Sequence, residues 1–157
     1  MIKTISGNII DLAEDGKFDY IVHGCNCFHT MGSGLAGQLV RRYPILLEAD
    51  KTTKRGDREK LGTWTSLRVL KDSYQFTIVN AYTQFFFGGG GDLFEYEAFD
   101  RFLTDFDSFL KTVRFNQKRV AFPKIGAGLA GGDWNRILKS IEAFAESQDV
   151  SIVEYVA

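Results

Sequence analysis

The chain has 157 residues, of which 45% are hydrophobic and 25% are charged, as in an ordinary globular protein. This length predicts one domain over residues 1–157. Its 19 basic and 20 acidic residues give a net charge of −1, which argues against a non-specific nucleic-acid binder, because that class carries a basic excess. No apolar run is long enough to span a membrane, and no signal-peptide pattern follows Met1. We expect a cytoplasmic monomer with no membrane partner.

The two cysteines of the chain, Cys25 and Cys27, are separated by one residue and are poorly placed for a disulfide with each other. They therefore indicate a reducing compartment. His23 and His29 stand close by, and such a group could hold zinc, but no second pair of ligands follows downstream. We expect neither a metal nor a cofactor.

Strands and helices are predicted to alternate in the first part of the chain. The expected elements are a strand at 2–5, a turn at 7–10, an apolar strand at 18–25, a polar loop at 27–33 and helices at 34–43 and 45–53. Pro44 either ends the first of these helices or begins the second. The charged run at 51–60 is interpreted as a solvated surface loop.

The rest of the chain begins with two paired strands and ends in further alternation. The expected elements are strands at 63–70 and 75–81 joined by a turn at 71–73, a long amphipathic helix with Asp92 as its N-cap and apolar positions from Phe94 to Val113, a strand at 119–125, a helix at 133–147 and a strand at 151–156. Three phenylalanines at 85–87 precede four glycines at 88–91. That segment is either a hinge beside a core plug or a flap that covers a ligand.

This order of elements predicts an α/β fold, a three-layer α/β/α sandwich around a mixed sheet, with ligands bound at the carboxyl ends of the strands. Two similar glycine loops, 32–37 and 126–131, follow predicted strands and lead into predicted helices. Free N–H groups at such helix starts favour an anion. Two such loops indicate one ligand with phosphates in its middle. Both loops fit G-x-G-x-x-G, but six residues separate the first strand from Gly32, so the dinucleotide-binding Rossmann context fails.

Four motifs in order carry a resemblance to the macrodomains, which bind ADP-ribose. They are Gly7-Asn8-Ile9, the segment from Ile21 to Cys27, Met31-Gly32-Ser33-Gly34-Leu35-Ala36, and the segment from Phe122 to Leu129 followed by Trp134. The match runs from Gly7 to Tyr155 and implies a single macrodomain. The His-x-Cys-Asn-Cys form and Arg42-Tyr43-Pro44 are most similar to the yeast-type ADP-ribose 1''-phosphate phosphatases. The terminal ADP-ribose protein glycohydrolases and DNA ADP-ribosyl hydrolases are a related branch.

The resemblance implies a ligand site at the carboxyl edge of the sheet. The residues expected to contribute are Gly7, Asn8, Ile9, Gly24, Cys25, Asn26, Met31, Gly32, Ser33, Gly34, Leu35, Ala36, Thr83, Ile125, Gly126, Ala127, Gly128, Leu129, Ala130 and Tyr155. Asn8 stands where the family usually has an aspartate that accepts from the adenine amino group, and Ile9 offers backbone to the same ring. Asn26 matches the residue that holds the distal ribose. Tyr155 either packs on adenine or is an ordinary edge-strand tyrosine.

The resemblance also limits the chemistry. The glycohydrolase branch attacks through a lysine and an aspartate, at the positions of Gln84 and Ala130 here, and a glutamine cannot form a Schiff base. Hydrolysis of a phosphate monoester needs an acid or base and donors for the phosphoryl oxygens. The candidates are His23, His29 and Asp133, with Asn80 or Thr83 at a strand end. His23 could instead be a satisfied core histidine, and Asp133 could be the N-cap of the last helix.

These inferences predict a protein that binds ADP-ribose and hydrolyses the phosphate of ADP-ribose 1''-phosphate. One alternative is a reader of ADP-ribosylated protein or nucleic acid without turnover. Another is a hydrolase that removes ADP-ribose from a macromolecule by means of a bound water.

Overall fold

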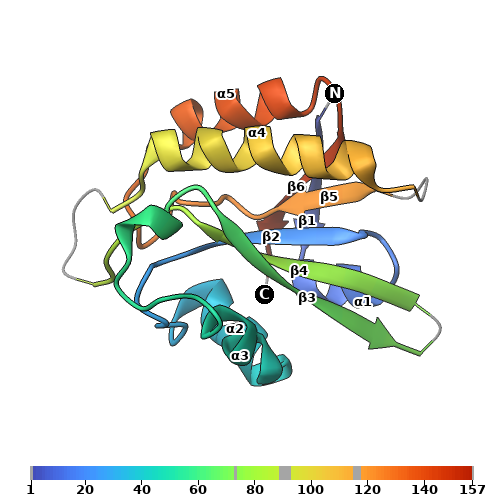
Figure 1. The fold of residues 1–157 in the computed structure, drawn as a ribbon. Helices are drawn as coiled ribbons and strands as arrows, with labels where there is room; N and C mark the ends of the chain where they lie inside the picture. Colours follow the sequence, from blue (N-terminus) through green and yellow to red (C-terminus); the bar gives the residue numbers. More distant parts are fainter. Residues whose placement is uncertain (1, 73, 89–92, 115–117, 157) are drawn as a thin grey trace.

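The elements of this computed structural model form one six-stranded sheet with helices on both faces (Figure 1). The structure describes residues 2–72, 74–88, 93–114 and 118–156. The strand order is β1-β6-β5-β2-β4-β3. All neighbouring strands are parallel except β3, which pairs antiparallel with β4 at one edge. The predicted three-layer α/β/α sandwich with a mixed sheet is confirmed.

The strands are β1 (Ile2–Gly7), β2 (Tyr20–Cys25), β3 (Trp64–Lys71), β4 (Tyr74–Tyr82), β5 (Arg119–Phe122) and β6 (Asp149–Tyr155). The helices are α1 (Ile9–Glu14), α2 (Gly34–Arg42), α3 (Ile45–Asp50), α4 (Tyr96–Thr112), α5 (Trp134–Phe144) and a short 3₁₀ turn, η1 (Arg58–Lys60). Pro44 is the N-cap of α3, so it begins the second helix of its pair. Over the described residues, no helix has the length and apolarity that crossing a membrane requires.

Two apolar cores lie on opposite faces of the sheet. Helices α4 and α5 cover the upper face in Figure 1, where Phe99, Phe102 and Phe106 pack against strand residues. Helices α1, α2 and α3 lie under the lower face, over a core that includes Leu39 and Leu46. Because β2 lies between parallel neighbours and under helices on both sides, it is buried almost throughout, as its apolar sequence predicts.

Several predicted boundaries are wrong. Strand β5 ends at Phe122 instead of residue 125, because Pro123 begins the loop, and α5 ends at Phe144 instead of residue 147. The long helix begins at Tyr96 with Glu95 as its N-cap, and Phe94 precedes it in a single bridge to Gln84. Asp92, the predicted N-cap, lies outside the described residues, as do Ser73 and the glycines 89–91.

The charged run at 51–60 is not simply a solvated loop. It contains η1, and its last residue, Lys60, is buried. The Lys60 ammonium donates to the Cys27 carbonyl at 3.3 Å and lies 4.6 Å from the centroid of the Tyr82 ring. Gly56 N–H donates to the same carbonyl at 2.7 Å. The run therefore packs against the loop that follows β2 and helps to shape it.

The sequence analysis missed helix α1. Asn8 is its N-cap, and the Asn8 Oδ1 accepts from the N–H groups of Ile10 and Asp11 at 2.9 and 3.2 Å. The six residues of this helix are too few for a clear 3.6-residue period. The cap itself, Asn8 followed three residues later by Asp11, is the signal that could have found it.

We expect Asn8→Ala to lower the free energy of unfolding by about 1 kcal/mol, because it leaves two helical N–H groups without their acceptor. Urea unfolding monitored by circular dichroism would measure the loss. Asn8→Asp keeps a capping oxygen and is the matched control. An alanine variant as stable as the parent chain would mean that water replaces the cap at no cost.

Candidate functional site

Four connected segments leave the sheet at one edge, the carboxyl edge of its parallel strands. The loops after β5 and β2 carry the two glycine motifs, and these strands are neighbours. On one side, Gly7 of β1 pairs with Tyr155 of β6, so Asn8 and Tyr155 leave the sheet together. On the other side, β4 ends at Tyr82 and is followed by Thr83 and Gln84. The edge therefore offers four features in a row, with both glycine loops in the middle.

The first glycine loop presents N–H groups at the start of α2. Gly32, Ser33 and Gly34 are exposed, and Ser33 is the N-cap without a capping side-chain bond. The N–H groups of Leu35 and Ala36 find no acceptor among the described residues. Unpaired N–H groups at the start of a nine-residue helix are suited to an anion.

The second glycine loop is closed on itself and fixed from below. Gly132 N–H donates to the Gly126 carbonyl at 2.7 Å, and Gly131 N–H donates to the Gly128 carbonyl at 3.0 Å. The tip, Gly128 and Leu129, is exposed, and its N–H groups meet no acceptor in the described parts of the chain. The loop is therefore a rigid support with free donors at its tip.

The glycines of these loops fall into two groups. A Cβ at Gly32 or Gly128 would meet nothing within 4 Å. At Gly126, whose φ is +76°, a Cβ would lie 2.3 Å from the Phe94 ring, and at Gly24 it would lie 2.7 Å from Thr83 Oγ1. Packing and backbone conformation explain the second group but not the first. Gly32 and Gly128 border open space, as residues that let backbone approach a ligand would.

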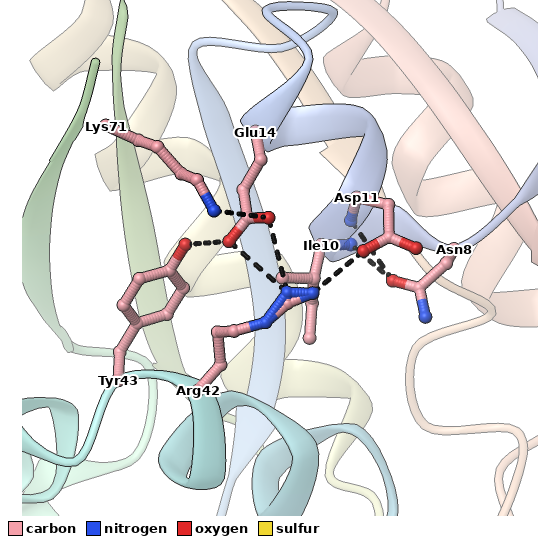
Figure 2. Close-up of polar contacts among 7 residues, drawn as sticks. All are labelled: Asn8, Ile10, Asp11, Glu14, Arg42, Tyr43 and Lys71. Carbon is pink, nitrogen blue, oxygen red and sulfur yellow. Dashed lines mark hydrogen bonds and ion pairs between the residues drawn. The ribbon is translucent and has the colours of Figure 1, made fainter.

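A network of charged side chains holds the Asn8 end of the edge (Figure 2). Arg42, at the end of α2, bonds to Asp11 at 2.9 Å and to Glu14 at 3.2 Å, and Tyr43 donates to Glu14 as well. Lys71 of β3 lies 3.3 Å from the same carboxylate. Burial tends to raise the pKa of Glu14, but the bonds from Tyr43, Lys71 and Arg42 outweigh it and lower that pKa. Arg42 and Tyr43 thus tie the end of α2 to α1, and Lys71 ties β3 to the same helix.

Asn26 holds the loop after β2 in shape. Its Oδ1 accepts from Phe28 N–H and its Nδ2 donates to the Thr30 carbonyl, both at 2.8 Å. His29, at a φ of 58°, places Nε2 3.0 Å from the Thr53 carbonyl. The Asn26 side chain is 8% exposed. Its expected contact with a ribose stays a prediction.

The three catalytic candidates lie in three separate environments. His23 is buried and bonds to Asn80, while His29 bonds to Thr53. The Asp133 Oδ1 accepts from Asn135 N–H at 3.0 Å and caps α5. Burial lowers the pKa of His23 to about 4, although the hydrogen bond to the Asn80 Oδ1 opposes this. His23 is therefore neutral at pH 7. A catalytic role for the three residues stays a prediction.

The phenylalanines at 85–87 pack against Phe28 of the first loop. The ring centroids lie 4.9, 5.3 and 6.1 Å from that of Phe28, with edge-to-face geometry for each pair. Arg55 lies over Phe28 and Arg58 over Phe85, at 5.3 and 4.4 Å. Phe86 is half exposed. The cluster is thus a small aromatic rim beside the first loop, and it combines packing, as in the plug interpretation, with an open edge. We call these residues, with their two arginines, the aromatic rim.

Gln84 and Ala130 occupy the two positions at which the lysine-dependent glycohydrolases have their lysine and aspartate. The Gln84 Nε2 donates to the Phe86 carbonyl at 2.9 Å, and Ala130 is buried with its carbonyl accepting from Leu93 N–H at 2.9 Å. Thr83 Oγ1 is buried and has no hydrogen-bond partner among the described residues. A buried hydroxyl without a partner at the ligand edge needs an explanation, such as an ordered water or a ligand group.

Several solved structures with this architecture are named macrodomains. The macrodomain of Thermus aquaticus DarG superposes with a TM-score of 0.77 and 22% identity, over 100% of this chain and 99% of the other. The macrodomain of Mycobacterium tuberculosis DarG gives 0.76 and 28%, over 100% and 98%. Thermosipho africanus DarTG in complex with ADP-ribose gives 0.69 and 16%, over 89% of this chain and 38% of the other. The fold is therefore the macrodomain fold.

No family model matches the sequence. A curated relative, the uncharacterised 17.5 kDa protein in the tk-vs intergenic region of Enterobacteria phage T4, is 36% identical over 156 residues, which cover 99% of this chain and 97% of that protein. The chain therefore belongs to the same family as this phage protein, and its fold is that of the macrodomains.

Proposed function

We propose that this protein binds ADP-ribose along the carboxyl edge of the sheet. The observation that carries the proposal is the order of features along that edge: an exposed tyrosine beside Asn8, then two glycine loops with free N–H groups, then the ends of β2 and β4. An adenine on Tyr155, a diphosphate between the loops and a distal ribose near Asn26 follow the same order. The DarTG structure in complex with ADP-ribose supports this choice of ligand.

The proposed reaction is hydrolysis of the phosphate from ADP-ribose 1''-phosphate. The motifs shared with the yeast-type phosphatases support it, and so does Gln84, which cannot supply the nucleophile of a lysine-dependent reaction. Thr83 Oγ1, unpaired at the end of β4, is suited to hold a water or a phosphoryl oxygen. A neutral His23 is suited to accept a proton from an attacking water if the two come into contact.

A second candidate is the release of ADP-ribose from a macromolecule. The observation that favours it is the aromatic rim, where Arg55 and Arg58 flank partly exposed rings beside the first loop. This is more surface than a single phosphate needs. The product separates the two reactions, because the first releases inorganic phosphate and the second releases ADP-ribose.

The first experiment is calorimetric titration with ADP-ribose, with NAD as the control, followed by phosphate release from ADP-ribose 1''-phosphate in the same samples. We expect micromolar binding of ADP-ribose, weak binding of NAD and steady phosphate release. Binding without phosphate release would reject the phosphatase and leave the second reaction or a reader. The absence of binding would reject the proposal altogether.

A further inference from the structure

A chain of buried polar side chains lies behind the ligand edge, on the side of the sheet that α3 covers. It runs in one row across β2, β4 and β3, where His23 pairs in register with Asn80, and Asn80 with Thr65. It then continues through Tyr82 to Asp50, the last residue of α3. The exposed fractions of His23, Asn80, Tyr82 and Asp50 are 3%, 0%, 0% and 1%.

Each link is within hydrogen-bond distance. The Tyr82 hydroxyl donates to Asp50 Oδ1 at 2.6 Å, and Thr65 Oγ1 lies 2.9 Å from the Tyr82 hydroxyl. Asn80 Nδ2 donates to Thr65 Oγ1 at 3.1 Å. Asn80 Oδ1 lies 2.6 Å from His23 Nε2. His23 and Asn80 are 57 residues apart in the sequence, and Asp50 and Tyr82 are 32 apart, but the fold brings them into one unbroken series.

The number of hydrogens fixes the direction of the series. Where Asp50 is a carboxylate it only accepts, so the single hydroxyl hydrogen of Tyr82 points to it. The Tyr82 oxygen must then accept from Thr65, whose own hydrogen is thereby used. Thr65 therefore accepts from the Asn80 amide, which turns Asn80 Oδ1 toward His23. That oxygen only accepts, so His23 Nε2 must carry a hydrogen.

The opposite orientation of the Asn80 amide leaves one of these contacts without a hydrogen. If the Asn80 amide were turned around, Thr65 would donate to Asn80, and no hydrogen would lie between the Thr65 and Tyr82 oxygens at 2.9 Å. Only a proton on Asp50 would repair this. The Cys25 thiol also faces the ring, with Sγ 3.6 Å from Nε2 and 3.9 Å from Nδ1, but sulfur is only a weak acceptor for either nitrogen.

We propose that this hydrogen-bonded chain holds His23 as the tautomer with its hydrogen on Nε2 and its lone pair on Nδ1, with Asn80 as the positioning residue. Its consequence for catalysis rests on the proposed function: where His23 acts as a base, it accepts the proton on Nδ1. The orientation of the Asn80 amide between Thr65 and His23 thereby determines which ring nitrogen of His23 is available.

The test is the side-chain ¹H–¹⁵N NMR spectrum of ligand-free protein labelled at histidine. The chain has two histidines, and a His29→Asn variant assigns the signals. We expect His23 to show a protonated Nε2 and an unprotonated Nδ1 at neutral pH. A protonated Nδ1, or comparable amounts of both tautomers, would overturn the proposal.

Thr65 offers a matched pair of variants. Thr65→Ser keeps the hydroxyl and should leave the His23 spectrum unchanged. Thr65→Val removes it, so Asn80 loses the bond that fixes its amide, and both tautomers should appear. An unchanged spectrum in folded Thr65→Val would show that the hydrogen-bonded series does not determine the His23 tautomer. Because the spectra need no ligand, a failure to bind ADP-ribose would reject the proposed function and leave this result standing.

Discussion

Replacing Gly32 and Gly128 together by alanine is expected to weaken ADP-ribose binding roughly 10- to 100-fold while leaving the fold intact. Neither position has a φ in the left-handed region, and an added methyl group would meet nothing within 4 Å. In the complex, however, the two methyl groups would occupy the space in which we place the phosphates. We expect the two methyl groups together to cost the equivalent of one charge-assisted N–H bond, about 1.5–3 kcal/mol, which gives approximately that range of affinity. Calorimetric titration of the variant against the parent chain measures it.

Gly126→Ala is the matched control from the same loop. Its methyl group would enter the Phe94 ring and hold alanine at a φ of +76°, so this variant should lose stability in urea unfolding. The two results separate ligand contact from packing. Full ADP-ribose affinity in the Gly32 and Gly128 variant would mean that the phosphates bind elsewhere, and a parent-like stability of Gly126→Ala would contradict the packing described for Phe94.

The spacing of apolar residues along the sequence predicted the sheet and most of the helices, because the residues at that spacing are the ones that the fold buries. Strand β2 and the amphipathic helix α4 are examples, since most of their buried residues are those that the pattern selects, although Phe109 of α4 is exposed. Helix α1 was missed because six residues are too few to show the 3.6-residue repeat of a helix. Its N-cap, Asn8, is the local signal that remains. Boundaries were wrong where one residue decides them, as Pro123 does after β5.

The candidate site was predictable only in part. The glycine loops and their strands are local in sequence, so both could be placed at the carboxyl edge. The partners of His23 could not be, because Asn80 is 57 residues away and Asp50 approaches only through Tyr82. The sequence also could not distinguish Gly128, which borders open space, from Gly126, which packs under a ring. That distinction depends on Phe94, which lies in another segment.

The burial of a neutral His23 should make the protein lose about 3 kcal/mol of unfolding free energy between pH 6.5 and pH 4. Burial lowers the pKa of His23 from 6.5 to about 4. In this window the unfolded chain binds a proton on His23 and the folded chain does not, so stability falls as the pH falls. Because the carboxylates with lowered pKa values, such as Asp19, titrate in the unfolded chain near or below pH 4.5, the loss from pH 6.5 to 5 isolates His23.

Chemical denaturation at pH 7, 6 and 5 measures this slope, which should approach 1.4 kcal/mol per pH unit at its steepest. His23→Asn keeps a side chain that can bond to Asn80 and removes the titration, so its unfolding free energy should be flatter over the same range. Equal slopes in the two proteins would show that His23 is protonated in the folded state as readily as in the unfolded chain. That result would place the pKa of His23 in the folded chain at its unfolded value, and the burial of His23 would then not control its protonation state.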